Sequence, residues 1–282
     1  MALQVAGIPV SADVLAIGIP VGMAVVVALL LFAMGPRVTR PVMAAFTPWM
    51  VTGAAAHALY TVDAYPEWAD PLFEPVAVYF TVFTAAGMVW AYMTTASTIS
   101  GEGNYDAQYV AAAGLGAPLV TAGFVLAQAQ GADLSRVLPT FGGLVGALVV
   151  GGGVYLLVGY FYSKVFVQTG ILGWLVVFGH SLDGVMTAVA ADVFGLPPLY
   201  TAGARLYAYA GTLPVPESAG QGWLVVVAKV ALALVVVSVV ASLRSREVFG
   251  DRDAVAYLLL TLVAAYGLGP GIHILLTLVL FP

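Results

Sequence analysis

The chain has no cysteine and very little charge. Only 8% of its 282 residues are charged, whereas soluble domains have roughly 25%. The absence of cysteine excludes disulfides, thiolate metal sites and a cysteine nucleophile. The net charge of -5 comes with no basic run and no basic-aromatic patch, so we expect no nucleic-acid partner.

Hydrophobic residues make up 62% of the chain and recur in long stretches. A helix needs about 20 mostly apolar residues to cross the hydrocarbon core of a bilayer. The sequence therefore predicts an all-α, polytopic transmembrane helix bundle, a single domain over residues 1–282 in the cell membrane, with the lipid bilayer as its partner. About eight spans are predicted: Val14–Met34, Val42–Val62, Val76–Ala96, Ala107–Gln130, Leu138–Phe161, Gly170–Val193, Gly222–Leu243 and Ala254–Leu280.

Basic residues in the connections predict the orientation. Most of them fall in odd-numbered connections, and the positive-inside rule places such connections in the cytoplasm, with both termini outside. The connection of residues 195–221 is long, and we expect it to hold a short surface helix or a lid. The odd-numbered connections carry Arg37, Arg40, Lys164, Arg244, Arg246 and Arg252, and the even-numbered ones carry Arg136 and Arg205.

The sixth predicted span carries ionisable residues near its middle. His180, Asp183 and Thr187 are three and four residues apart, so they share one face of a helix. An ionised group at the bilayer centre costs several kcal/mol, and such residues usually face a partner or a cavity and mark function. This face must therefore point into the protein.

Three more ionisable residues lie in other predicted spans: His57, Lys229 and His273. At about 1.5 Å of rise per residue, all of them fall in the outer half of the bilayer with His180 and Asp183. Lys229 is the lysine within a predicted span and lies at nearly the depth of Asp183, so we expect it to pair with Asp183. Residues 267–271, Gly-Leu-Gly-Pro-Gly, predict an interruption of the eighth helix just before His273. Each residue also has a structural interpretation, as a packing histidine or as a lysine that extends to the interface.

Three classes of function fit these residues. We favour a proton- or ion-coupled transporter of unknown substrate, in which Asp183, Lys229 and the histidines change protonation or partner. One alternative is a membrane-embedded zinc-dependent hydrolase, with His57, His180, Asp183 and His273 as the metal ligands. Lys229 argues against it, since a cation beside a dication is repelled. The other alternative is a structural or assembly protein whose polar residues specify helix packing. The sequence identifies no catalytic residue and no substrate.

Two segments resemble a known family. They are GHSLDGVMTAVAADVFG at residues 179–195, with its H-x-L-D-G core followed by Thr187, and PWMVTGAAAHALYTVDAYP at residues 48–66. Both are similar to the archaeal multi-pass membrane family catalogued as domain of unknown function 63. The resemblance implies an archaeal integral membrane protein and assigns no catalytic residue. The segment around Lys229 also resembles the retinal-binding helix of microbial rhodopsins, but the eighth predicted span argues against a rhodopsin.

Overall fold

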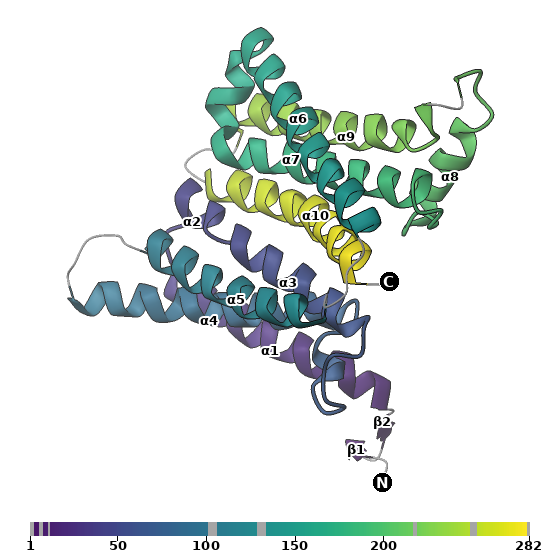
Figure 1. The fold of residues 1–282 in the computed structure, drawn as a ribbon. Coiled ribbons are helices and arrows are strands. Elements are labelled where there is room, and N and C mark those ends of the chain that lie inside the picture. The colour runs from purple at the N-terminus through teal and green to yellow at the C-terminus, as the bar shows by residue number, and fades with distance from the viewer. Residues whose placement is uncertain are drawn as a thin grey trace. The chain divides into compact units, whose positions relative to one another are not determined.

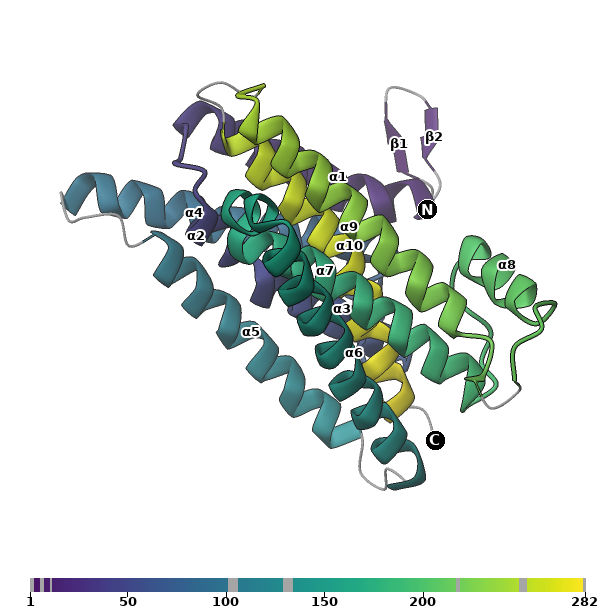
Figure 2. The same ribbon diagram turned by 90° about the horizontal axis from the view of Figure 1, so that it is seen from above.

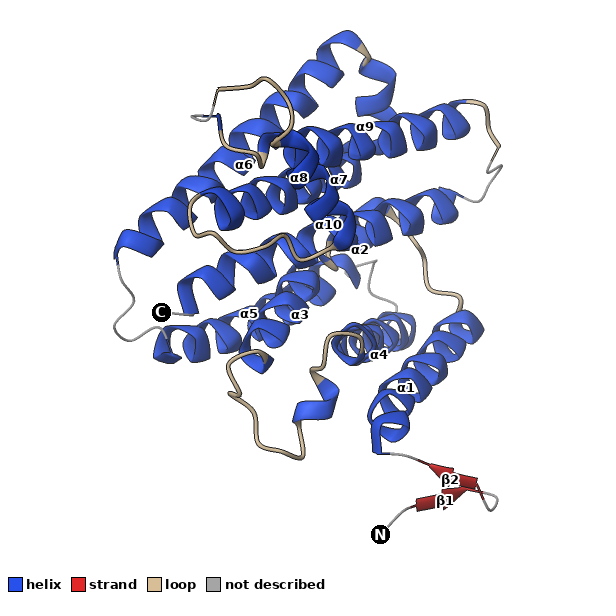
Figure 3. Cartoon of the chain, turned by 90° about the vertical axis from the view of Figure 1, so that its right-hand side faces the viewer, coloured by secondary structure: helices blue, strands red, loops and turns tan. Residues whose placement is uncertain are grey.

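The chain is helical apart from a short hairpin near its N-terminus (Figures 1 and 3). The computed structural model describes residues 3–5, 8–10, 12–100, 106–128, 134–216, 219–248 and 253–280. The hairpin pairs β1 (Leu3–Val5) with β2 (Ile8–Val10) in antiparallel register. The chain forms two compact units, Met1–Arg37 with Ala45–Phe124, and Val38–Ala44 with Val125–Pro282. A single domain over residues 1–282 stays a prediction, because two compact units can belong to one domain.

The first unit contains four α-helices and one 3-10 helix within its described residues. They are α1 (Ala12–Met34), α3 (Thr47–Tyr60), η1 (Asp70–Leu72), α4 (Ala77–Ser100) and α5 (Asp106–Gln128). Helix α1 packs against α4. The buried indole of Trp49 on α3 donates a hydrogen bond of 3.0 Å to the carbonyl of Val110 on α5. This bond joins α3 to α5.

The second unit is built around α7. Its described helices are α2 (Arg40–Ala44), α6 (Leu134–Phe161), α7 (Ser163–Asp192), α8 (Thr201–Ala210), α9 (Trp223–Ser245) and α10 (Asp253–Leu280). Helix α7 packs against α6, α9 and α10 (Figures 1 and 2). Among the described helices that are long and apolar enough to cross a membrane, α7 is the most buried. In its apolar stretch, 61% of the residues are buried inside the protein. The stretch that carries His180 and Asp183 is thus the central helix of this unit.

Seven helices are long and apolar enough to cross a membrane, by length and composition alone. This makes the chain compatible with a multi-pass integral membrane protein. The second predicted span is divided between α2 and α3 by a turn at Ala45 and Phe46. Helix α5, which corresponds to the fourth predicted span, is not among the seven. This count applies to the described residues, which do not include Gln130 or several side chains of α5.

The predicted interruption of the last helix is wrong. Helix α10 is continuous from Asp253 to Leu280 with Pro270 inside it. Its glycines allow close packing instead of a break. A Cβ atom at Gly267 would lie 2.6 Å from His180 Nδ1, and one at Gly271 would lie 2.8 Å from Asp183 N. Membrane helices often use small residues for such close approach, and they tolerate proline where neighbouring groups compensate.

The break lies in α7 instead. Gly170 has φ 55° and ψ -140°, a conformation that favours glycine strongly over other residues. It separates a short N-terminal stub, Ser163–Thr169, from the long segment that carries the polar residues. A stretch that the sequence predicts as a connection between the fifth and sixth spans is therefore helical.

Candidate functional site

The centre of α7 carries an ion pair with α9. Lys229 Nζ of α9 contacts Asp183 Oδ2 of α7, and the two side chains are 17% and 1% exposed. One turn further along α7, the Thr187 hydroxyl donates a long hydrogen bond of 3.4 Å to Asp183 Oδ1. The predicted pairing of Asp183 with Lys229 is confirmed, as is the face that Asp183 shares with Thr187.

A glycine next to Asp183 brings the two helices together. A Cβ atom at Gly184 would lie 3.0 Å from Val226 Cα and 3.5 Å from Lys229 Cβ. The backbones of α7 and α9 therefore approach closely at this level. This close approach places the lysine directly opposite the carboxylate.

His180 lies one turn before Asp183 and is 1% exposed. Its Nδ1 is 3.0 Å from the carbonyl oxygen of Val176. A carbonyl oxygen can only accept, so Nδ1 carries a proton in this contact. The other ring nitrogen, Nε2, is then the position at which His180 can gain or lose a proton. Among the described residues, no hydrogen bond joins His180 to Asp183.

Two tyrosines connect the ion pair with His180. Lys229 Nζ lies 5.6 Å from the centroid of the Tyr200 ring, which is stacked on Tyr266 at 6.5 Å. The ring of Tyr266 is in turn 6.3 Å from that of His180. Our sequence analysis did not include Tyr266 in the site. Tyr266 directly precedes Gly267, the glycine at which α10 approaches His180. This position in the sequence is the signal that identifies Tyr266.

The long connection between α7 and α9 is fixed at Asp192, near the end of α7. Asp192 Oδ1 accepts hydrogen bonds of 2.9 Å from the Tyr207 hydroxyl of α8 and from the backbone N–H of Gln221. Its Oδ2 accepts one of 2.9 Å from Gly222 N, at the start of α9. Burial raises the pKa of Tyr207, and the bond to Asp192 raises this pKa further. The expected short helix is present as α8, and Tyr200 directly before it reaches Lys229.

The remaining two histidines of the predicted site lie on other helices. His57 belongs to α3 in the first unit; its Nδ1 lies 3.2 Å from the carbonyl of Phe73, and its ring is stacked on Tyr60. His273 belongs to α10 in the second unit and is 9% exposed. Its carbonyl accepts a hydrogen bond of 2.7 Å from Thr277. The Asp183 contacts described above involve neither histidine.

The zinc hypothesis gains no support from the described geometry. Within the described ranges, no group of three or more His, Cys, Asp and Glu side chains could hold a metal ion. The four ligands that it requires are His57, His180, Asp183 and His273. The candidate site is therefore the smaller set on α7 and α9, with Tyr200 and Tyr266 beside it.

Comparison with known proteins identifies no relative. No family model, no curated protein and no solved structure matches the chain. The resemblance to the archaeal membrane family stays a prediction that rests on the two segments around His57 and His180. The functional argument therefore depends on the site itself.

Proposed function

We propose that this chain is an integral membrane protein that couples the movement of a small solute to a proton or ion at Asp183. The Asp183–Lys229 ion pair supports the proposal most strongly. Both partners lie within helices that are long and apolar enough to cross a membrane. Ionisable residues in such positions mark ion and substrate pathways.

The coupling follows from the cost of leaving one buried charge alone. Breaking a buried pair leaves an uncompensated charge, which costs about 3–5 kcal/mol. A proton on Asp183 removes its negative charge and frees Lys229 to bind an anionic group of the solute. Release of the solute favours loss of the proton and return of the pair. His180, one turn away, offers Nε2 as a second position for the proton.

The proposal also includes the number of spans and their orientation in the membrane. Eight spans, with α5 as the fourth, place both termini outside and the basic odd-numbered connections in the cytoplasm. In this arrangement Asp183 and Lys229 lie in the outer half of the bilayer. Arg252, one of the basic residues behind this orientation, lies outside the described residues.

A structural role is the second candidate, and the same contact supports it. The ion pair fixes α7 against α9 at the point where Gly184 brings their backbones together. Under this interpretation the pair specifies packing and never separates. The two candidates differ in whether water ever reaches the site from each side of the membrane.

Cysteine accessibility separates the two candidates without knowledge of the solute. The chain has no native cysteine, so Thr187→Cys places a single thiol in contact range of Asp183. We expect a membrane-impermeant thiol reagent to label this cysteine from either side of sealed vesicles, because a transporter opens its site alternately to both. The measurement is the rate of labelling from each side.

Ser181→Cys is the matched control. Ser181 is on the same helix and fully buried, but it faces Gly151 of α6, where a Cβ atom would lie 3.3 Å from its hydroxyl oxygen. We expect no labelling there. Labelling of Thr187→Cys from neither side would support the structural role, and labelling from one side alone would contradict alternating access.

A further inference from the structure

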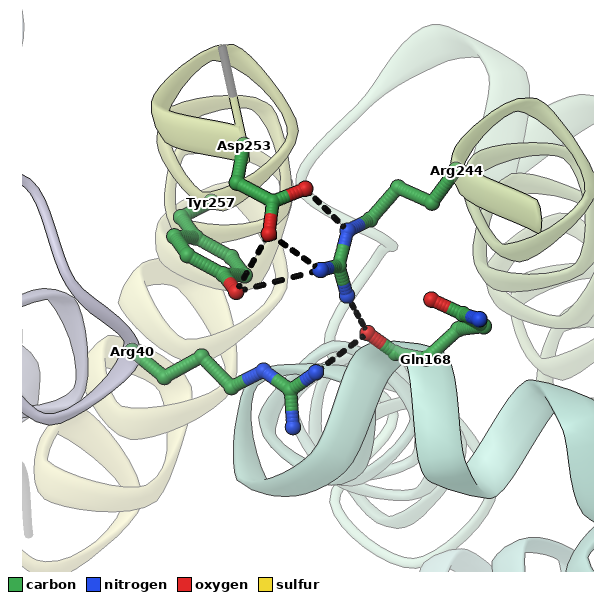
Figure 4. Close-up of polar contacts among 5 residues, drawn as sticks. All are labelled: Arg40, Gln168, Arg244, Asp253 and Tyr257. Carbon is green, nitrogen blue, oxygen red and sulfur yellow. Dashed lines mark hydrogen bonds and ion pairs between the residues drawn. The ribbon is translucent and has the colours of Figure 1, made fainter. Parts of the chain in front are cut away.

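A second polar cluster lies at the other end of the long α7 segment, beside the kink (Figure 4). The carbonyl of Gln168 accepts hydrogen bonds from two arginines, from Arg40 Nη2 at 3.2 Å and from Arg244 Nη1. Two residues further along, the carbonyl of Gly170 accepts a hydrogen bond of 2.5 Å from the Tyr155 hydroxyl. Because Gly170 interrupts the helix, these carbonyls need donors from outside it.

One of the two arginines is fully neutralised. Arg244 Nε and Nη2 bind the two carboxylate oxygens of Asp253 at 2.9 and 2.6 Å. The Tyr257 hydroxyl lies 3.2 Å from both Arg244 Nη2 and Asp253 Oδ2. The Arg244 side chain is 7% exposed. Its charge and its donors are thus satisfied within the protein.

The other arginine makes no direct ion pair with a described carboxylate, although Asp253 is close enough for its charge to interact with that of Arg40. Arg40 donates to the Gln168 carbonyl and lies 5.6 Å from the Tyr257 ring centroid. Its Nε is buried and makes no hydrogen bond to a described residue. Because both arginines bind the same carbonyl, their like charges are close together, while Asp253 balances one of them. The described cluster therefore carries one excess positive charge.

The residues of the cluster lie at or near the ends of apolar helical segments, where a helix that crosses a membrane leaves the hydrocarbon core. Arg40 and Asp253 are the first residues of apolar helical segments, Gln168 is near the start of one, and Arg244 is near the end of another. Exposed aromatic side chains, typical of a membrane interface, lie at the α6–α7 junction. They are Tyr160, Phe161, Tyr162 and Phe166, and the exposed Lys164 lies one turn before Gln168.

We propose that Arg40 binds the phosphate of an anionic phospholipid headgroup, with Lys164 as an additional cation on the same surface. A guanidinium presents two parallel N–H groups to phosphate oxygens, which gives both energy and orientation. Basic positions between membrane helices at headgroup depth bind anionic lipids in this way. Arg244 stays paired with Asp253 and positions the Gln168 carbonyl that orients Arg40.

The test compares two arginines with the same formal charge. Purified full-length protein in detergent is titrated with a fluorescent phosphatidylglycerol, with fluorescent phosphatidylcholine as the zwitterionic reference. We expect Arg40→Gln to weaken phosphatidylglycerol binding about fivefold, since one basic residue near anionic lipid contributes about 1 kcal/mol. Arg246→Gln removes the same charge from an exposed position just after α9, and we expect a smaller change.

Arg40→Lys keeps the charge and loses the paired N–H groups, so we expect intermediate binding. It also serves as the test if Arg40→Gln does not fold. Unchanged binding in the Arg40 variants, or equal weakening by Arg246→Gln, would overturn the proposal. Inorganic phosphate is added as a competitor. If it displaces the lipid at comparable concentration, the site binds free phosphate and the lipid proposal fails.

Discussion

The second unit contains two ion pairs, which differ in how strongly each charge depends on its partner. Asp183–Lys229 lies within the apolar helices α7 and α9, away from their ends, with the carboxylate 1% exposed and a long hydrogen bond from Thr187 beside it. Arg244–Asp253 lies at helix ends, with the carboxylate 50% exposed and with Gln168 and Tyr257 as further partners. At the second pair, the Gln168 carbonyl and the Tyr257 hydroxyl still bind Arg244 if Asp253 is neutralised. At the first, each charge depends on the other.

The two pairs therefore suit different roles. The first can change its charge state, and the second holds helices together. A buried pair with few other partners changes state as a unit, because the loss of one charge leaves the other exposed to a low dielectric. The second pair loses less when its half-exposed carboxylate is neutralised, because the Gln168 carbonyl and the Tyr257 hydroxyl still bind the guanidinium. The difference is consistent with the proposed coupling at Asp183 and Lys229, and with attachment of the α7 kink by Arg244 and Asp253.

The largest expected effect comes from breaking the central pair. Lys229→Met leaves the buried carboxylate unpaired, so we expect a loss of about 3–5 kcal/mol in the free energy of unfolding. Asp183→Asn leaves the lysine, which is more exposed, and should cost less. The double variant should recover most of the loss. Folded yield and thermal unfolding in detergent measure this; additive losses in the double variant would show that the two side chains do not depend on each other.

A smaller effect is expected at the kink that the arginines stabilise. Gly170→Ala places a side chain in a strained backbone conformation, and its Cβ would lie 3.2 Å from Arg40 Nη1. We expect a loss of about 1–3 kcal/mol. Gly152→Ala is the control, because no atom lies within 4 Å of a Cβ there. Equal thermal stabilities for the two variants would mean that the kink is not constrained.

The smallest effect is expected at the interfacial pair. Asp253→Asn removes a half-exposed carboxylate, while Arg244 keeps the Gln168 carbonyl and the Tyr257 hydroxyl. We expect a loss of about 1 kcal/mol, because these two partners still bind the buried guanidinium, and a smaller loss at high salt, because the half-exposed carboxylate is screened. Thermal unfolding at low and high ionic strength gives the measurement. A loss as large as that of Lys229→Met would remove the distinction between the two pairs.

Features that follow from helix periodicity and from the cost of burying a charge could be predicted from the sequence. Asp183 and Thr187 share a face because they are four residues apart. Lys229 was the expected partner because a carboxylate in an apolar helix needs a cation or a proton. The seven described helices that are long and apolar enough to cross a membrane follow from hydropathy and length. The count of eight spans and the orientation stay predictions.

Features that depend on contacts between distant helices were not predictable in this way. The sequence predicts a break at the glycines around Pro270, and it predicts Gly170 only as the first residue of the sixth span. The glycines of α10 instead accommodate the backbone of α7, whereas Gly170 breaks its helix. Arg40 and Arg244 are 204 positions apart (244 − 40). Their convergence on one carbonyl depends on where α7 kinks, which the sequence pattern did not reveal.

The most direct test of the central claim is how pH changes the two-sided accessibility of the site. In Thr187→Cys, the ratio of labelling rates from the two sides of the vesicle is measured over a range of pH, with the same pH on both sides. The ratio removes the reactivity of the thiol itself. If protonation of Asp183 controls access, the ratio changes with pH in Thr187→Cys and becomes independent of pH when Asp183→Asn is added. A ratio that is already independent of pH with Asp183 present would contradict the account.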